Sequence, residues 1–205
     1  TQSDEDLRSF VDIFPISLKL QQQPCLIVGG GHIAYRKAIL LAKAGAKIDV
    51  VAPEIDASLL VLIEQSGGQY VQAPFSLDLP LKNYRLVIAA TDDNAVNTAV
   101  FEACEAEKIL VNSVDDPPHC RFMVPAIVDR SPLVISIASN GTSPVLSRQI
   151  RTQLESSIPH GMGKLAEFSG KWRGAVKAKI TNPDERRVFW EDLYASPLKE
   201  QVFND

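Results

Sequence analysis

The 205-residue chain is predicted to be an α/β protein whose first half forms a parallel sheet with helices on both faces. Strand-like and helix-like segments alternate regularly between residues 25 and 115, which is typical of such a sheet. A run of glycines at 29–31 separates the first strand from the first helix. After Pro117-Pro118 the alternation stops, which indicates a small α+β region followed by a C-terminal helical domain.

The first half contains short apolar runs that are typical of buried parallel strands. They cover residues 25–28, 48–51, 69–72, 85–90 and 109–111. Apolar residues at helical spacing predict a helix over 32–44, which Gly45 ends. A second helix is expected over 56–65 with Asp56 as its N-cap, and a third extends to about Glu107.

The second half begins with a predicted hairpin. Strands over 126–128 and 133–137 flank Asp129-Arg130-Ser131-Pro132, which reads as a turn. Thr142 or Ser143 is expected to cap a helix that starts at Pro144. Two further helices are predicted over about 163–180 and 183–195.

The glycine run fits the pattern G-x-G-x-x-A between a strand and a helix. The first glycine permits the tight turn, the second lets the backbone approach a pyrophosphate, and the small final residue allows close helix packing. The helix N-terminus then holds the anion. The pattern indicates a Rossmann-type sheet that binds NAD, although a strand-to-helix turn without a ligand gives the same string. The predicted cofactor-binding residues here are Gly29, Gly30, Gly31, His32, Ile33 and Ala34.

Parallel sheets bind their ligands outside the carboxyl ends of the strands. Pro53 and Glu54 follow the second strand, where a carboxylate can bind a ribose hydroxyl and repel a 2′-phosphate. This position favours NAD over NADP. Further cofactor-binding residues are expected at the ends of two other strands, namely Thr91, Asp92, Asn112, Ser113 and Val114.

The densest group of potential proton acceptors is Asp115, Asp116, His119 and Cys120. Their spacing matches no structural zinc pattern, so no metal site is predicted. One interpretation is a solvated turn with a capping aspartate. The other is a carboxylate base beside the nicotinamide, and the position of Asp115 one strand end from the glycines favours that role for Asp115.

The charge of the chain is uneven, because the net charge is −4 while residues 141–190 carry nine basic and four acidic residues. A basic region beside an acidic one suggests an anionic ligand, and charge alone leaves nucleic acid and a polycarboxylate both open. The three cysteines are far apart, and neither a signal peptide nor a membrane-length apolar run is present. A cytoplasmic protein without a membrane partner is therefore expected. Motifs of hydrolases and nucleoside triphosphatases are absent from the sequence.

Several longer segments resemble one family, the precorrin-2 dehydrogenase/sirohydrochlorin ferrochelatase module of siroheme synthases. The segments are FPISLKL, CLIVGGGHIAYRKA, VIAATDD, NSVDDP, MVPAIVDRSPLVISIASNGTSPVLSRQIR and ERRVFW. The resemblance extends over about residues 14–190, and its most specific part is the stretch 123–151. The chain departs from the family in having His32 where an acidic residue often follows the glycines.

This resemblance implies an NAD-binding domain over 1–124, a dimerisation region over 125–160 and a helical domain over 161–205. It implies a homodimer with the active site between the domains. The essential aspartate of the family falls on Asp115, and a serine phosphorylated in some members falls on Ser139. The substrate-binding residues are expected to be Ser139, Asn140, Gly141, Thr142 and Ser143.

The function implied by the resemblance is NAD-dependent oxidation of precorrin-2 to sirohydrochlorin, together with insertion of ferrous ion as a substrate. An anionic tetrapyrrole, and not nucleic acid, would then account for the basic region. Asp115 would accept the protons that both reactions release. Two alternatives stay open: an enzyme with one of the two activities, and a non-catalytic NAD-binding regulator or redox sensor.

Overall fold

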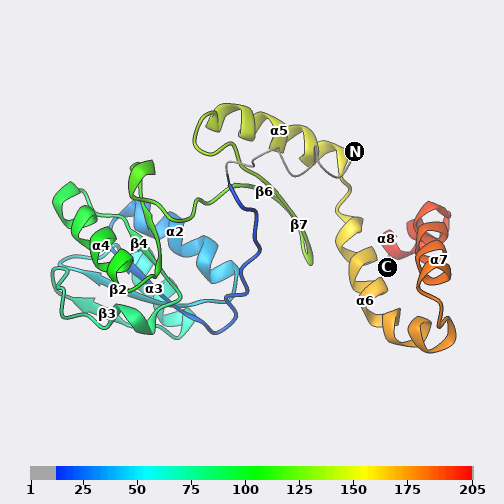
Figure 1. The fold of residues 1–205 in the computed structure, drawn as a ribbon, viewed down its shortest axis with the longest axis horizontal. Helices are drawn as coiled ribbons and strands as arrows, with labels where there is room; N and C mark the ends of the chain where they lie inside the picture. The colour runs from blue at the N-terminus through cyan, green and yellow to red at the C-terminus, as the bar shows by residue number, and fades with distance from the viewer. Residues whose placement is uncertain (1–12, 205) are drawn as a thin grey trace, which may run out of the picture. The chain divides into compact units, whose positions relative to one another are not determined.

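The computed structural model describes residues 13–204, which divide into two compact units between Met123 and Val124 (Figure 1). The part before this division is called the N-terminal unit below, and the part after it the C-terminal unit. Each unit has its own secondary structure and is described separately. Within residues 13–204, no helix has the length and apolar character that crossing a membrane requires.

The N-terminal unit is built on one sheet of five strands in the order β3-β2-β1-β4-β5, and every neighbouring pair is parallel. The chain moves outward from β1 to β3, then returns across β1 to β4, so the direction of winding reverses between β1 and β4. Such a reversal opens a crevice at the carboxyl ends of the strands. The predicted parallel α/β sheet is confirmed. The strands are β1 (Pro24–Val28), β2 (Lys47–Ala52), β3 (Tyr70–Gln72), β4 (Leu86–Ala89) and β5 (Leu110–Ser113).

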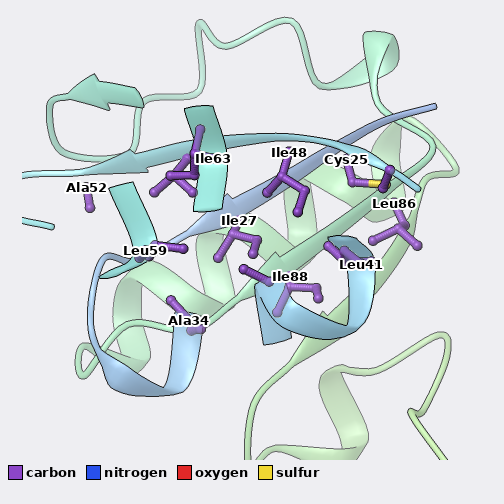
Figure 2. Packing of buried hydrophobic residues seen from close by; sticks show 14 of the residues in the cluster. Cys25, Ile27, Ala34, Leu41, Ile48, Ala52, Leu59, Ile63, Leu86 and Ile88 are labelled. Carbon is purple, nitrogen blue, oxygen red and sulfur yellow. The ribbon is translucent and has the colours of Figure 1, made fainter. Parts of the chain in front are cut away.

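Three helices cover the two faces of the sheet. Successive residues of a buried strand point to opposite faces, so both faces carry apolar side chains that the helices bury. Ile27 packs with α2 and α3 in one apolar cluster (Figure 2), whereas its neighbour Leu26 packs with α4 in the other. Each fully buried leucine or isoleucine stabilises the fold by about 1.5–3 kcal/mol. The helices are α2 (His32–Lys43), α3 (Ala57–Ser66) and α4 (Asn94–Ala106), and short 3₁₀ turns cover Leu81–Asn83 and Pro117–His119.

Aspartates cap two of these helices. Asp56 Oδ1 accepts a hydrogen bond of 2.7 Å from the Ser58 backbone N–H, so the predicted N-cap is confirmed. Asp93 Oδ1 does the same for α4, at 2.8 Å from the Ala95 N–H. Helix α2 differs, because its N-cap is Gly31, which has no side chain to occupy the N-terminus.

The C-terminal unit starts with the antiparallel hairpin β6 (Ala126–Arg130) and β7 (Leu133–Ile137). The predicted turn over 129–132 was too long, since Asp129 and Arg130 belong to β6 and Arg130 pairs with Leu133. The buried Arg130 side chain explains why this polar residue continues the strand. The helices that follow are α5 (Pro144–Ser157), α6 (Gly161–Lys179), α7 (Pro183–Ala195) and α8 (Leu198–Asn204), the last of which was not predicted.

Helix α5 begins at Pro144 with Ser143 as its N-cap residue, as predicted, but the expected capping hydrogen bond is not formed. The Thr142 hydroxyl donates instead to the Ser139 carbonyl, and Ser139 Oγ accepts from the Ser143 N–H at 3.2 Å. The left-handed backbone of Asn140 and Gly141 closes this turn, which uses the hydroxyls internally before the helix begins.

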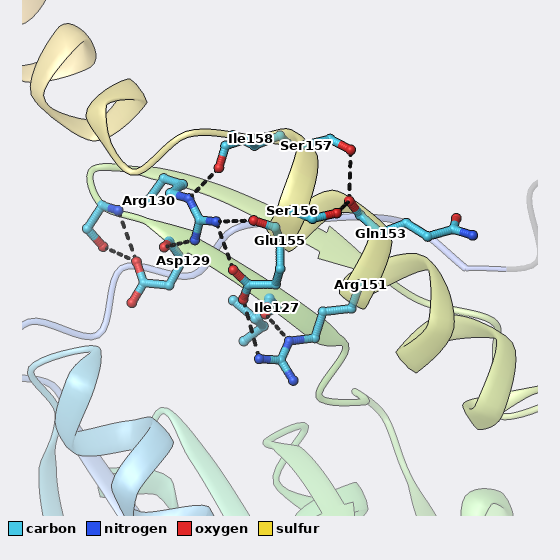
Figure 3. Close-up of polar contacts among 10 residues, drawn as sticks. Ile127, Asp129, Arg130, Arg151, Gln153, Glu155, Ser156, Ser157 and Ile158 are labelled. Atoms are coloured by element: carbon cyan, nitrogen blue, oxygen red, sulfur yellow. Dashed lines mark hydrogen bonds and ion pairs between the residues drawn. The ribbon is translucent and has the colours of Figure 1, made fainter. Parts of the chain in front are cut away.

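Arg130 connects the hairpin to α5 (Figure 3). Its guanidinium donates to the carbonyls of Ile158, Asp129 and Glu155, each at 2.9 Å, and forms an ion pair of 2.8 Å with the Glu155 carboxylate. Arg151 adds a second cation at 3.3 Å from the same carboxylate. Because Arg130 is 4% exposed, these partners replace the water that the buried charge has lost.

The carboxylate of Glu155 makes the stability of the C-terminal unit depend on pH, and acid is expected to lower it. Hydrogen bonds from Arg130, and then its charge and Arg151, lower the pKa of Glu155 below its usual value. A lowered pKa in the folded state contributes stability that is present above the unfolded pKa and is lost as the pH falls through the folded pKa. We therefore expect the thermal midpoint of Glu155→Gln to fall less than that of the parent chain between about pH 6 and pH 3. Equal slopes in the two pH series would contradict this.

Candidate active site

A cavity of about 910 Å³ lies at the carboxyl ends of the N-terminal unit's strands. It occurs where the winding reverses, as expected for an open parallel sheet. Its lining includes nine of the predicted cofactor-binding residues: Gly29, Gly30, Gly31, His32, Ile33, Pro53, Glu54, Thr91 and Asp92.

The three glycines of the cavity wall have different roles. Gly29 has a φ of +122°, and a Cβ there would lie 2.2 Å from the Ala90 carbonyl oxygen. A Cβ on Gly30 would lie 1.9 Å from the Glu54 carbonyl oxygen. A Cβ on Gly31 would meet nothing within 4 Å. The fold therefore requires glycine at 29 and 30, whereas the protein leaves the space beside Gly31 open.

This open space suits an anion. The N–H groups in the first turn of a helix lack intrahelical partners, and the helix dipole is positive there. Helix α2 begins at His32, directly after Gly31, and has no acidic residue in its first turn. A pyrophosphate group fits this position because the backbone can approach it without a side chain in between. The residues present thus fit a dinucleotide cofactor.

The end of β2 contributes acidic groups to the cavity. Both Glu54 and Asp56 line it, and the Asp56 N–H donates to the Gly30 carbonyl at 2.8 Å. The capping hydrogen bond from Ser58 lowers the pKa of Asp56. The sequence assigned Asp56 a capping role alone, although its place just after a strand end is the signal that identifies it as a lining residue. The lining residues that were not predicted also include Val28, Val51, Ala52, Ile55, Pro74, Phe75, Ala90, Asp93 and Val96.

Other predicted residues lie outside this cavity. Ala34 is fully buried, where it lets α2 pack against the sheet. Asn112, Ser113 and Val114 lie at the end of β5, the strand beside β4, and none of them lines the cavity. The predicted substrate-binding residues 139–143 form the turn before α5 in the C-terminal unit, and their role stays a prediction.

Asp115 follows β5 in a left-handed conformation, with a φ of 58°. This region is less favourable for residues with a Cβ, although aspartate tolerates it better than most. The Val114 N–H donates to the Ala89 carbonyl at 2.9 Å, which ties this turn to the end of β4. Among residues 13–204, the exposed Asp115 side chain makes no hydrogen bond or ion pair. Its carboxylate is therefore free to accept a proton.

The neighbouring carboxylate has a different environment. Asp116 Oδ2 lies 2.6 Å from His119 Nδ1, and Phe101 packs edge-on against the His119 ring. Asp116 and His119 thus satisfy each other. Within residues 13–204, no cluster of three or more histidine, cysteine or acidic side chains could hold a metal ion.

Within residues 13–204, two buried polar atoms at the end of β5 have no hydrogen-bond partner: Asn112 Oδ1 and Ser113 Oγ. The Asn112 side chain donates through Nδ2 to the Phe122 carbonyl at 3.0 Å and to Cys120 Sγ at 3.3 Å. Its Oδ1 accepts no hydrogen bond within residues 13–204. An unsatisfied buried polar atom costs about 1–3 kcal/mol.

Comparison with known proteins agrees with the geometry. Residues 16–126 match the family described as putative NAD(P)-binding, and residues 161–205 match the sirohaem synthase dimerisation region. The second match covers the segment for which we expected the helical domain, whereas we expected the dimerisation region at 125–160. The family description thus names a different segment as the one that dimerises.

Two curated relatives cover nearly all of this chain. The siroheme synthase of Acinetobacter baylyi is 73% identical over 196 residues, which are 95% of this chain and 43% of that protein. The siroheme synthase of Chromobacterium violaceum is 49% identical over 194 residues, which are 95% of this chain and 41% of that protein. The chain therefore spans less than half the length of these relatives.

A solved structure, titled SirC, precorrin-2 dehydrogenase, has the same fold. It superposes with a TM-score of 0.71 at 24% identity and covers 93% of this chain and 96% of its own. The predicted order of a Rossmann-type domain, a small α+β region and C-terminal helices is thus confirmed. With its glycine cradle, its parallel sheet and the match over residues 16–126, the chain belongs to the putative NAD(P)-binding family, and its relatives at 73% and 49% identity are siroheme synthases.

Proposed function

We propose that this chain binds NAD and uses it to oxidise precorrin-2 to sirohydrochlorin, acting as a homodimer. The observation that carries the proposal is the open cradle at Gly31 together with the unpaired carboxylate of Asp115 at a nearby strand end. The names of the siroheme synthase relatives support the pathway, and the match to a dimerisation region supports the homodimer.

The oxidation removes a hydride and a proton from the tetrapyrrole. NAD, when bound, supplies the acceptor for the hydride. Gly31 and the N-terminus of α2 would hold its pyrophosphate. Asp115 accepts the proton. Because its carboxylate forms no hydrogen bond or ion pair within residues 13–204, no existing contact has to break first. Holding the substrate and the cofactor in contact supplies much of the remaining rate enhancement.

The proposal includes a second reaction, the insertion of ferrous ion into sirohydrochlorin to give siroheme. The iron is a substrate here and needs no resident site. Two pyrrole N–H protons must leave as the metal enters the ring. Asp115 serves as their acceptor too, so one carboxylate supports both reactions.

Glu54 is expected to set the preference for NAD over NADP. Glu54 lines the cavity just after the end of β2, and a carboxylate there would repel the 2′-phosphate of NADP. We expect Glu54→Gln to lower the ratio of the NADP dissociation constant to the NAD dissociation constant by about 10-fold. Titration calorimetry with each cofactor measures the two constants. Glu64→Gln, which removes an exposed carboxylate on α3 outside the cavity, is the matched control. An unchanged ratio in Glu54→Gln would assign the preference to another residue.

The test of the proposed function is anaerobic incubation of the purified chain with precorrin-2, with and without NAD. NADH formation and the tetrapyrrole spectrum are followed together, and ferrous ion is added after the oxidation is complete. NAD-dependent formation of sirohydrochlorin is the expected result. Tight NAD binding without turnover would favour the alternative of a non-catalytic NAD-binding regulator.

A further inference from the structure

Lys37 of α2 is a cation that forms no ion pair within residues 13–204. It lies one turn after Ala34, at the edge of the helix face that buries Ala34, Ala38 and Leu41. The residue is half-buried, and its side chain makes no hydrogen bond or ion pair with any residue of 13–204. Taking an ammonium group partly out of water without a partner costs free energy, so this position favours an anion.

The loop 114–122, which follows β5, lies on the same face of the sheet as α2. Val114 and Phe122 of this loop pack against the apolar cluster that contains Ala34 and Ala38, so the loop and α2 share one face of the sheet. Burial lowers the pKa of Lys37, while the charges of Cys120 and Asp115 raise it. The ammonium group therefore lies within electrostatic reach of Asp115, although the two groups form no ion pair in residues 13–204.

Lys37 thus lies in the electrostatic surroundings of Asp115, and neither side chain forms an ion pair within residues 13–204. A carboxylated ligand such as a tetrapyrrole can supply an anion that pairs directly with Lys37.

We propose that Lys37 is a substrate-binding residue that pairs with one carboxylate of the tetrapyrrole and so positions the reacting ring beside Asp115. This inference rests on the proposed function and assigns part of its substrate specificity to α2. Arg36, the adjacent and exposed cation of the same helix, does not share this role, because it projects away from the buried face.

The test compares Lys37→Met with Arg36→Met, which removes the same charge from the neighbouring position. Binding of uroporphyrin, a stable porphyrin polycarboxylate, is followed by fluorescence quenching, and precorrin-2 oxidation is followed by NADH formation. We expect Lys37→Met to weaken uroporphyrin binding and raise KM for precorrin-2 by about 10–100-fold, the loss of one charge-assisted contact. Changes in kcat and in NAD affinity should stay within about 3-fold, and Lys37→Arg should restore most of the binding.

Three results would overturn the inference. Equal losses in Lys37→Met and Arg36→Met would indicate general attraction of an anion, and a fall in kcat without a change in KM would indicate an effect on Asp115 instead. Absence of uroporphyrin binding by the parent chain would remove the site altogether. Lys37→Gln and thermal unfolding of each variant check that the fold is retained. Lys37-dependent porphyrin binding without oxidation of precorrin-2 by the parent chain would refute the proposed function and leave the Lys37 site supported.

Discussion

Replacing Asp115 with Asn is expected to slow precorrin-2 oxidation by about 10²–10⁴-fold, the usual contribution of a positioned general base. The amide keeps the shape of the side chain but cannot accept the proton that leaves with the hydride. NAD affinity should not change, because Asp115 lies outside the cavity that holds the glycine cradle. Steady-state NADH formation and NAD titration of the same preparation measure the two quantities separately.

Asp116→Asn is the matched control for this variant. It makes the same change one residue later, in a carboxylate that is already engaged by His119 at 2.6 Å. We expect a rate within about 5-fold of the parent chain, together with a modest loss of stability from the broken pair. Asp115 has no role as the proton acceptor if the two variants retain the same activity.

A pair of glycine variants should separate the requirement of the fold from the requirement of the cofactor. Gly30→Ala is expected to destabilise the N-terminal unit by about 3 kcal/mol or more, because its Cβ would overlap the Glu54 carbonyl oxygen at 1.9 Å. The free energy of unfolding of Gly31→Ala should lie within about 0.5 kcal/mol of that of the parent chain. The added Cβ meets nothing within 4 Å, and the φ of −86° at this position suits alanine. NAD affinity of Gly31→Ala should nevertheless fall by about 10-fold or more, because the methyl group occupies the pyrophosphate position.

Denaturant unfolding without cofactor and NAD titration provide the two readouts. The requirement of the cofactor is distinguished from that of the fold only if Gly31→Ala is as stable as the parent chain and binds NAD more weakly. A Gly31→Ala variant with parental NAD affinity would show that the pyrophosphate binds elsewhere in the cavity. A fully stable Gly30→Ala variant would show that the β2 end moves to accommodate the methyl group.

Local patterns in the amino-acid sequence predicted the elements of the N-terminal unit well. Apolar runs such as 25–28 and 48–51 became β1 and β2, and Asp56 caps α3 as expected. These features depend on the periodicity and chemistry of neighbouring residues, which any single sequence displays. The errors occur in the C-terminal unit, where partners distant in sequence prevail. Arg130 reads as a turn residue, yet its bonds to Glu155 and Ile158 hold it in a strand.

The glycine run, the strand ends and Asp115 could all be located from the order of residues, because a parallel sheet brings its strand ends to one edge. Their individual roles required the folded chain. Gly30 and Gly31 are identical in the sequence and differ only in what faces them, a carbonyl oxygen 1.9 Å away in one case and open space in the other. Asp115 and Asp116 likewise differ because His119 reaches one carboxylate and not the other. Such partners come from backbone geometry and packing across segments, which residue order alone does not specify.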